Sequence, residues 1–275
     1  MIDHLVIGHI TRDRLPDGGY APGGTALYAA ATAARLGARA AVLTAGNPAQ
    51  LPLAPPGVAL HVTPAAATTT FANRYHPDGR HQCLHELAPP ITLATLPTAW
   101  RAAPVVHLAP VAGEVDLALA AAFPTALVGV TPQGWMRAWD APLPAPVRPA
   151  PWRPAPALLR QLALIVLSIE DVGHDEALAA SYAAHCSLVV VTRGAAGATL
   201  YLAGVPEPVA PCLARERDPT GAGDVFAAAL LLRLAETGNP RAAANFASAA
   251  AACAVEGVGH LALPDRAAVL ARGAG

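Results

Sequence analysis

Residues 218–226 read Asp-Pro-Thr-Gly-Ala-Gly-Asp-Val-Phe (DPTGAGDVF) and continue directly into the apolar stretch AAALLLRLAETG. A helix start needs one capping side chain, and Asp218 or Thr220 can supply it. The glycines have another use, because each of them lowers helix stability. They let the backbone approach a ligand closely, with N–H groups that lack intrahelical partners. A helix start of this kind binds anions, and phosphate above all.

The carboxylate of Asp224 lies inside this expected anion site, and the motif therefore has two interpretations. In the first, the motif is a glycine-rich turn, and the helix dipole favours a carboxylate in the first turn. In the second, the backbone at Gly221, Ala222 and Gly223 holds a phosphoryl group while Asp224 takes the proton from an incoming hydroxyl. Phosphoryl transfer depends on positioning more than on a strong base, so an ionised carboxylate suffices for this role.

The composition limits the classes of protein and of chemistry. With 275 residues and 54% hydrophobic residues, the chain can bury a full core. No uncharged apolar run reaches the roughly 18 residues of a membrane span, and the N-terminus lacks a signal peptide pattern. All 18 basic residues are arginine, which excludes Schiff-base catalysis and the Walker A lysine. We expect a soluble cytoplasmic protein with no nucleic-acid or membrane partner and with its four separated cysteines reduced.

Strand and helix patterns alternate along the chain. The segment DHLVIGHI (3–10) predicts a buried strand, which a glycine-rich entry, a helix over 23–37 and the strand ARAAVLTAG follow. Such an order begins a parallel α/β sheet, doubly wound with helices on both faces. The same reasoning gives these further elements: strands at 104–110, 125–130, 162–168 and 187–194, an antiparallel strand in ATLYLAG, and helices at 174–185, 221–237 and from Asn239 to about Gly257.

Two segments depart from this alternation. Residues 60–87 alternate polar and apolar side chains around a Pro-Asp-Gly turn, which is typical of an antiparallel hairpin. We expect this hairpin, joined by residues 11–20, to form a small β lid on a single domain of residues 1–275. The proline-rich stretch 141–157 is either a surface loop of that domain, which we favour, or an interdomain linker.

Three motifs together resemble the ribokinase-like (PfkB) carbohydrate kinases. DPTGAGDVF matches their usual form D-T-x-G-A-G-D, and GGTALYAAATAARLGA is similar to their N-terminal signature. VVVTRGAAGATLY looks like the strand and turn of their nucleotide site, and the three motifs occur in the family's order. The resemblance implies the ribokinase-like fold, with ATP and Mg²⁺ as cofactors.

The resemblance also implies roles for individual residues. Asp224 becomes the catalytic base, with an anion hole at 221–223. Asp13, Gly23 and Gly24 match the positions that hold the hydroxyls of the acceptor. The donor nucleotide site is implied at Ser168, Thr192, Gly194, Gly197, Thr220, Asn245 and Ala249.

Two positions depart from the family pattern. The N-x-x-E motif, which the family uses for magnesium and phosphate, falls near LSIEDV, where this chain offers Ser168 and Asp171. Asp171 is then the candidate metal ligand. Tyr28 stands where ribokinase has an asparagine that touches the sugar, which argues against ribose as the acceptor.

The branch that phosphorylates myo-inositol has stretches similar to TTFANRY (69–75) and VTPQGWMR (130–137). This likeness makes Asn73, Gln133 and Arg137 candidate residues beside the acceptor or the transferred phosphate. The alternative is that they are an ordinary polar strand residue, a loop residue and a solvated arginine.

Histidines suggest a further set of candidates. In a strand, His81, Cys83 and His85 would share one face, and with His76 they are zinc-ligand types. Their spacing matches no compact zinc motif, so we favour polar lid strands over a zinc site. His9 and His107, at strand ends, either line the pocket or lie in the core.

The sequence therefore predicts a kinase that transfers the γ-phosphoryl group of ATP to a hydroxyl of a sugar or cyclitol, with myo-inositol favoured. The alternatives are a nucleoside kinase of the same fold and a non-catalytic nucleotide or polyol sensor. A Rossmann-type dehydrogenase is excluded, because no G-x-G-x-x-G follows the first strand. The lid face is a possible homodimer surface.

Overall fold

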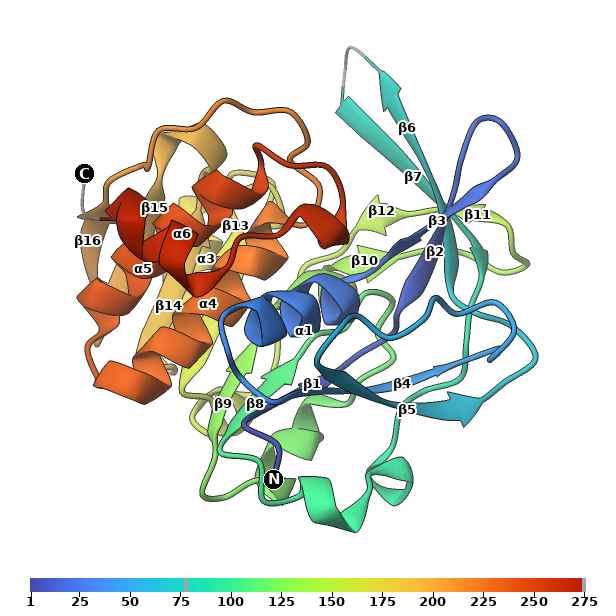
Figure 1. Ribbon diagram of the computed structural model, residues 1–275, viewed down its shortest axis with the longest axis horizontal. Helices are drawn as coiled ribbons and strands as arrows, with labels where there is room; N and C mark the ends of the chain where they lie inside the picture. The colour runs from blue at the N-terminus through green and yellow to red at the C-terminus, as the bar shows by residue number, and fades with distance from the viewer. Residues whose placement is uncertain (77–78, 274–275) are drawn as a thin grey trace.

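The computed structural model describes residues 1–76 and 79–273. Its centre is a nine-stranded sheet with the strand order β16-β15-β14-β13-β9-β8-β1-β4-β5 (Figure 1). Seven of these strands, from β14 to β5 in this order, pair in parallel. At one edge, β15 pairs antiparallel with β14, and β16 pairs antiparallel with β15. The strands of the large sheet are β1 (His4–Ile7), β4 (Ala40–Gly46), β5 (Val58–Pro64), β8 (Val105–Leu108), β9 (Leu127–Val130), β13 (Leu164–Ser168), β14 (Leu188–Thr192), β15 (Ala198–Leu202) and β16 (Val205–Val209).

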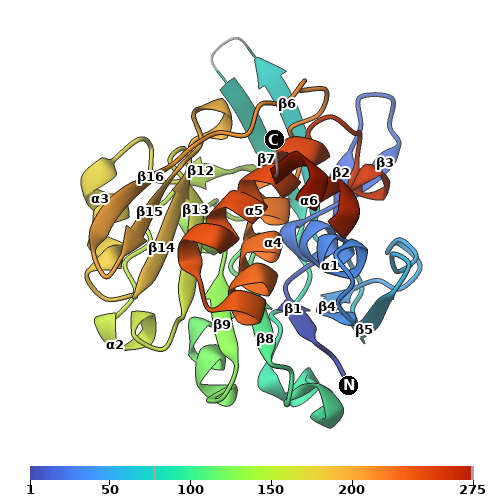
Figure 2. The same cartoon turned by 60° about the vertical axis from the view of Figure 1, so that its left-hand side comes forward.

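Helices cover both faces of this sheet, as Figures 1 and 2 show. The α-helices are α1 (Thr25–Arg35), α2 (Pro156–Leu159), α3 (Glu176–Ala183), α4 (Ala222–Thr237), α5 (Pro240–Ala254) and α6 (Arg266–Gly273). Short 3-10 helices are η1 (Leu93–Thr95), η2 (Thr98–Trp100), η3 (Leu117–Ala122), η4 (Pro132–Met136), η5 (Gly194–Ala196) and η6 (His260–Ala262). The sheet and its helices confirm the expected doubly wound, ribokinase-like class.

Each face of the large sheet has its own hydrophobic core. On one face, side chains of α1, α4 and α5 pack against Val6, Val42 and Val166. On the other face, Leu5, Ile165 and Val189 pack with residues of η3, α2 and α3. Strands buried on both faces read as continuous apolar runs, which is why the sequence shows them clearly.

The helix pair α4–α5 follows local signals in the sequence. Gly238 ends α4 in the left-handed region with a φ of 63°, a conformation that glycine adopts without strain. Asn239 caps α5 by accepting hydrogen bonds from the backbone N–H groups of Arg241 and Ala242, and Pro240 occupies the first turn. The predicted junction is confirmed, and α5 ends at Ala254, slightly before the expected Gly257.

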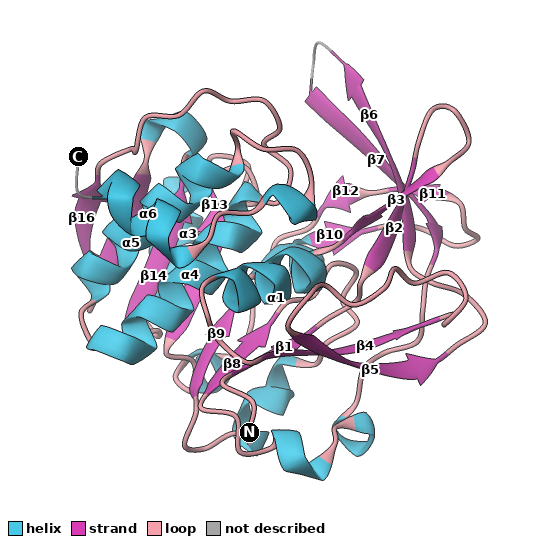
Figure 3. Cartoon of the chain, viewed as in Figure 1, coloured by secondary structure: helices cyan, strands magenta, loops and turns pink. Residues whose placement is uncertain are grey.

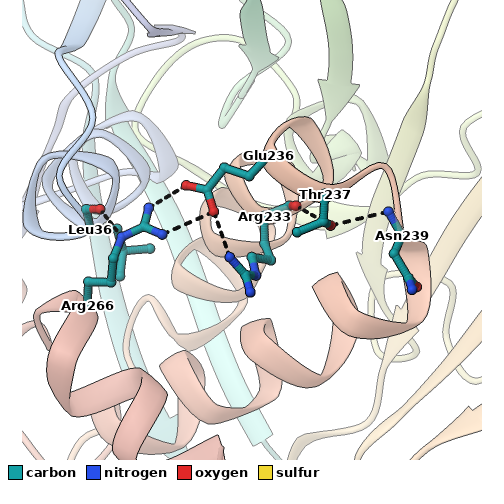
Figure 4. A network of polar contacts seen from close by, with 6 residues as sticks. All are labelled: Leu36, Arg233, Glu236, Thr237, Asn239 and Arg266. Carbon is teal, nitrogen blue, oxygen red and sulfur yellow. Dashed lines mark hydrogen bonds and ion pairs between the residues drawn. The ribbon is translucent and has the colours of Figure 1, made fainter.

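A polar network ties the ends of three helices together (Figure 4). Glu236 of α4 accepts from the guanidinium groups of Arg233 and Arg266. Arg266, at the start of α6, also donates through Nε to the carbonyl of Leu36 beyond the end of α1, at 2.7 Å. Hydrogen bonds from Arg266 lower the pKa of Glu236. The network joins α1, α4 and α6 on the helical face.

A second, five-stranded sheet stands beside the first, with the order β11-β7-β6-β2-β3 (Figure 3). Its strands are β2 (Thr11–Arg14), β3 (Tyr20–Gly23), β6 (Thr70–His76), β7 (Gly79–Glu86) and β11 (Ala145–Pro146), and the short pair β10 (Arg137–Ala138) and β12 (Arg148–Pro149) lies apart from it. Residues 11–20 join the 70–86 hairpin as expected, through parallel pairing of β2 with β6. The expected Pro-Asp-Gly turn includes residues 77–78, which lie outside the described residues.

The boundaries of this second sheet differ from the sequence prediction in two places. Residues 60–64, expected in the hairpin, belong to β5 of the large sheet, because they pair with β4. The proline-rich stretch contributes β11, which pairs with β7. This pairing attaches the stretch to the small sheet. Over the described part of the chain, none of the helices combines the length and apolar character needed to cross a membrane.

Candidate active site

Helix α4 begins at Ala222, and its N-cap is Gly221, with a φ of 78° and no side-chain cap. The expectation that Asp218 or Thr220 caps this helix is therefore wrong. Asp218 Oδ1 instead accepts from the N–H of Thr220 at 3.0 Å, and Oδ2 accepts from the N–H of Gly259 at 3.1 Å. The carboxylate is thus used to fold the turn before the helix and to hold the loop that follows α5. Burial would raise the pKa of Asp218, but these hydrogen bonds outweigh it and lower the pKa.

The first turn of α4 contains the predicted anion hole. Gly221, Ala222 and Asp224 are half-buried and Gly223 is exposed. The N–H of Ala222 donates to the carbonyl of Pro219 at 3.1 Å, so this amide is already used in the turn. The other N–H groups at a helix start have no intrahelical acceptor, and the positive end of the helix dipole lies here.

The ring of Tyr28, from α1, forms one wall of this region. A β-carbon on Gly221 would lie 2.3 Å from Cδ1 of Tyr28, so the ring packs directly on the glycine backbone. Tyr28 is only 5% exposed, and its ring meets that of His260 edge to face at 6.2 Å. Burial raises the pKa of Tyr28, and the charges of Asp218, Asp224 and Asp13 raise it further. The phenol therefore stays protonated beside three carboxylates.

Asp13 comes from β2 of the small sheet, yet its charge reaches the same Tyr28 ring as that of Asp224. Its carboxylate lies over Gly23, where a β-carbon would be 2.6 Å from Oδ2. Gly24 has a φ of 92° and would place a β-carbon 2.6 Å from the carbonyl oxygen of His9. Both glycines are required by close packing. The charges of Asp13 and Asp224, 211 positions apart in sequence, thus both act on one phenol.

Three further candidates lie around the small sheet. Asn73 Oδ1 accepts from Gln82 Nε2 at 2.8 Å across the β6–β7 pair. Arg137 donates to the carbonyl of Val111 at 2.8 Å, and its guanidinium lies 5.5 Å from the Phe71 ring centroid. Gln133 is half-buried in η4. Arg137 is therefore a residue packed under the small sheet and not a solvated one.

A cavity of about 280 Å³ opens beside the start of α4. It is lined by Thr192, Gly194, Ala195, Gly197, Pro211, Cys212, Leu213, Ala214, Glu216, Pro219, Ala222, Gly223, Phe226, Ser248, Ala251, Ala252 and Val255. Three of the expected donor-site residues, those at 192, 194 and 197, are among them, and so are two of the expected anion hole. The walls are mostly small and apolar, which suits a flat aromatic group next to a phosphate site.

Other expected donor-site residues lie elsewhere. On α5 the cavity is lined by Ser248, Ala251 and Ala252, whereas Asn245 is exposed to solvent and Ala249 is buried. Thr220 is exposed just before the helix. Neither residue lines the cavity: Asn245 lies on the same stripe of α5 as Ser248 and Ala252 but about one turn earlier, and Ala249 is turned by about 100° from Ser248.

The degenerate motif after β13 is a tight turn. Asp171 Oδ2 accepts from the N–H of Ser168 at 2.9 Å, and Ser168 Oγ accepts from the N–H of Glu170 at 3.2 Å. Ser168 and Thr192 end the neighbouring parallel strands β13 and β14 in register. Asp171 thus lies at the carboxyl edge of the large sheet, the edge at which α/β proteins bind ligands.

Magnesium in kinase sites binds through one or two carboxylates and the substrate phosphates. The described residues hold no group of three or more His, Cys, Asp or Glu placed to bind a metal. Asp171, just after the end of β13, is one carboxylate of the kind that a phosphate-bound Mg²⁺ uses. The residues present therefore fit magnesium only together with a bound phosphate.

The histidines fall into two groups. His81 and Cys83 lie on β7 opposite Arg74 and Ala72, within an ordinary hairpin pair, and the side chain of His76 lies outside the described residues. His107 is fully buried, and its ring stacks with that of His4 at 6.0 Å. Burial lowers the pKa of His4 to about 4 and that of His107 to about 3. His107 is a core histidine.

Sequence reasoning missed two features of this edge. Glu114 is 3% exposed and accepts hydrogen bonds from the backbone of His9, Val111 and Ala112. Its surroundings in sequence, VAGEVD, carry no motif, and the only signal is an acidic residue soon after a buried strand. The cavity wall on α5 was missed because it consists of alanines and a serine. Small residues of this kind occur on every face of this helix, so the sequence does not show which face lines a cavity.

Comparison with known proteins gives a family match over part of the chain and a fold over nearly all of it. Residues 163–266 match the family described as pfkB family carbohydrate kinase. No curated protein matches the sequence significantly.

Solved structures match over nearly the full length. A pyrophosphate-dependent kinase in the ribokinase family, solved as a sulfate complex, is 22% identical, with a TM-score of 0.82 over 98% of this chain and 99% of that one. The same kind of kinase complexed with a pyrophosphate analogue and myo-inositol is 20% identical, with a TM-score of 0.80 over 98% and 99%. Ribokinase of Arabidopsis thaliana, complexed with ribose and ATP, is 19% identical, with a TM-score of 0.72 over 99% and 98%. The match over residues 163–266 and the shared fold support the resemblance to the ribokinase-like (PfkB) carbohydrate kinases, and the chain has the ribokinase-like fold.

Proposed function

We propose that this enzyme transfers the γ-phosphoryl group of ATP to a hydroxyl of a cyclitol or sugar, with myo-inositol as the favoured acceptor. The observation that carries the proposal is that the charges of Asp13 and Asp224 both act on the Tyr28 phenol, whose ring packs on Gly221 at the start of α4 beside the cavity. An acceptor hydroxyl held by Asp13 would then lie between a base and an anion site.

In this mechanism the chain positions charge and moves one proton. Asp224 accepts the proton of the attacking hydroxyl as the oxygen bonds to the γ-phosphorus and the bond to the leaving phosphate oxygen breaks. N–H groups at the start of α4 stabilise the charge on the transferred group. Asp171 would hold Mg²⁺, which neutralises phosphate charge when bound. We further propose that the small sheet closes as a lid to exclude water from the donor phosphate.

The shape and polarity of the cavity support ATP as the donor. An adenine ring would fill the space between the 210–216 loop and α5, where Ala251 and Val255 form an apolar wall. Pyrophosphate, which has no apolar part, would leave this wall without a partner. Pyrophosphate is nevertheless the second candidate donor, because two of the structures most similar to this chain are pyrophosphate-dependent kinases.

The acceptor is supported by likeness and by chemistry. A similar structure holds myo-inositol, and Asn73 and Arg137, which lie on and beneath the small sheet, add polar groups suited to a polyol. A nucleoside acceptor, the alternative within the same fold, would need aromatic stacking, for which Phe71 and Tyr28 are candidates. The sensor alternative has less support, since a binding protein has no use for a base such as Asp224.

The setting of the enzyme is part of the proposal. All four cysteines are free thiols, which suits a reducing cytoplasm. Leu15 and Tyr20, near the turn between β2 and β3, are exposed apolar side chains. They support a homodimer through the small sheet, which light scattering at several protein concentrations would test.

The first experiment measures donor turnover against a panel of acceptors. The panel contains myo-inositol, ribose, fructose, 2-keto-3-deoxygluconate and adenosine, with ATP and Mg²⁺ and with Asp224→Asn as the control. Turnover with one acceptor that disappears in the variant establishes the activity and its acceptor class. Binding of ATP without turnover on any acceptor favours the sensor.

A second experiment distinguishes the two donors. Replacing Ala251 with tryptophan should fill the cavity and raise the KM for ATP at least about 10-fold, since a buried ring displaced from an apolar site loses that much affinity. The same variant should leave the KM for pyrophosphate unchanged. A matched substitution, Ala242→Trp, at an exposed position near the start of α5 that does not line the cavity, serves as the control. An enzyme that uses only pyrophosphate would contradict the ATP proposal.

A further inference from the structure

Three of the chain crossings that join the small sheet to the large sheet pass through one region. β1 leads through His9 into β2, β5 leads through Thr68 and Thr69 into β6, and β7 returns through Ala88 and Pro89. These crossings lie far apart in sequence. In the structure they meet at one buried polar cluster, which we call the hinge cluster: His9, Thr69 and Glu114.

The ring of His9 links two of the crossings. It is completely buried, and Nε2 lies 3.1 Å from the carbonyl oxygen of Pro89, while Nδ1 lies 2.7 Å from Oγ1 of Thr69. A carbonyl only accepts, so Nε2 carries the hydrogen, and Nδ1 accepts from the Thr69 hydroxyl. Burial lowers the pKa of His9 and favours this neutral form. Thr69 Oγ1 in turn accepts from the N–H of Ala88 at 3.0 Å, which closes the link.

Glu114 fixes the third side of the cluster. Its Oε1 accepts from the N–H of His9 at 2.8 Å, and its Oε2 accepts from the N–H of Ala112 at 2.8 Å. The N–H of Val111 lies 3.1 Å from both oxygens. The backbone carbonyl of Glu114 accepts from the N–H of Ile91, just after the return crossing. A buried carboxylate with N–H donors on both oxygens holds these segments in one arrangement.

The segment held by Glu114 is also the surface on which the small sheet rests. Val111 and Ala112 form a separate apolar cluster with Phe71 and Leu84 of β6 and β7. The carbonyl of Val111 accepts from Arg137, whose guanidinium lies over Phe71. One carboxylate thus sets the crossing that leads to Asp13, the support of the sheet and the position of Arg137.

We infer that Glu114 is a positioning residue of the phosphoryl transfer, which acts through His9 and Thr69 to fix the lid over the acceptor. The inference rests on the proposed function for its kinetic effects. It is distinct from the acceptor site itself, because Glu114 and His9 are buried behind the backbone that they hold.

The test uses two nearly isosteric variants of the full chain. Glu114→Gln replaces an accepting oxygen with an NH₂ group that faces backbone N–H donors, and Thr69→Val removes the hydroxyl that joins His9 to Ala88. The control is Phe123→Leu, a core substitution at the opposite, amino-terminal end of the parallel strands. If Glu114→Gln does not fold, Thr69→Val carries the test alone.

The first readout is hydrogen exchange, which needs no substrate. Amides of β2 and β6 should exchange about 10-fold faster or more in both hinge variants, while those of β1 and β4 stay unchanged. In Phe123→Leu the two sheets should change together. If the hinge variants behave like Phe123→Leu, or leave β2 and β6 unchanged, the inference is overturned.

The second readout is kinetic. Glu114→Gln should raise the acceptor KM about 10-fold or more, leave the donor KM unchanged and raise the ratio of acceptor-free donor hydrolysis to transfer. Equal changes in both KM values would overturn the positioning role. If the wild-type enzyme phosphorylates no acceptor, the proposed function fails, and the exchange experiment still decides whether Glu114 holds the lid.

Discussion

Gly221 has a φ of 78°, and the Tyr28 ring occupies the space that a β-carbon at position 221 would need. These constraints are independent, since one concerns the backbone and the other a neighbouring side chain. Gly238, at the other end of α4, has a φ of 63° with no atom within 4 Å of an added β-carbon. One helix therefore has a glycine at each end, and only one of them is also limited by packing.

Alanine at the two positions should separate these effects. Gly238→Ala should lower the free energy of unfolding by about 1 kcal/mol, the cost of a left-handed alanine. Gly221→Ala should lower it by roughly 2–4 kcal/mol, because the methyl group also displaces a buried ring. Urea denaturation of both variants provides the measurement. Equal losses would show that Tyr28 does not constrain position 221.

Asp224 and Asp13 should differ in their kinetic effects. Asp224→Asn should lower kcat by a factor on the order of 10²–10⁴, as loss of a positioned base does, with stability little changed. Asp13→Asn should mainly raise the acceptor KM, because the role proposed for Asp13 is to hold acceptor hydroxyls without taking a proton. Steady-state kinetics with the acceptor identified by the panel measures both. Near-normal turnover in Asp224→Asn would remove that residue from the role of base.

The sequence predicts roles for residues whose motifs indicate their chemistry, such as Asp224 in its glycine-rich turn. It could not identify Glu114, because the donors to this carboxylate are backbone N–H groups from positions 9, 111 and 112, and backbone N–H groups leave no sequence signal. The contact between Tyr28 and Gly221 could not be predicted either, because it joins two helices that are far apart in the sequence.

Elements with local signals were predicted well. The end of α4 at Gly238 and the start of α5 at Asn239 follow from capping chemistry that involves only neighbouring residues. Strand β11 was missed, because its pairing with β7 joins residues about 60 positions apart. The network of Figure 4 also escaped prediction, since Arg266 and Leu36 lie 230 positions apart.

Arg266 allows a test of how the helical layer is held together. Arg266→Ala should lower the free energy of unfolding by about 1 kcal/mol, and the coupling with Glu236→Ala in a double-mutant cycle should be about 0.5 kcal/mol. The coupling should shrink in 1 M salt, because both side chains are partly exposed. The exposed pair of Arg39 and Asp3 provides the matched control and should show a smaller coupling.

The whole molecule is expected to lose stability in mild acid, because His4 and His107 are buried in the neutral form. Their folded pKa values, about 4 and about 3, lie below the ordinary 6.5. Between pH 6.5 and pH 4 the unfolded chain therefore binds more protons than the folded chain, and the free energy of unfolding falls as the pH falls. Each histidine should cost on the order of 2 kcal/mol at pH 5.

Chemical denaturation at a series of pH values measures this slope. Replacing both histidines with phenylalanine should flatten the dependence between pH 6.5 and pH 4. The control is His185→Gln, which alters an exposed histidine and should leave the slope as in the wild type. A wild-type stability that is constant over this window would contradict the expectation.

The order in which Asp13 and Asp224 are synthesised also determines when a growing chain can become active. Asp13 leaves the ribosome 211 residues before Asp224, so a growing chain contains the proposed acceptor-binding carboxylate long before it contains the proposed base. The strands of the small sheet come from segments near residues 11–23, 70–86 and 145. They can pair only after the large sheet has brought these segments together. A partly synthesised chain should therefore bind sugars weakly and transfer nothing, and activity should appear only as the final helices dock.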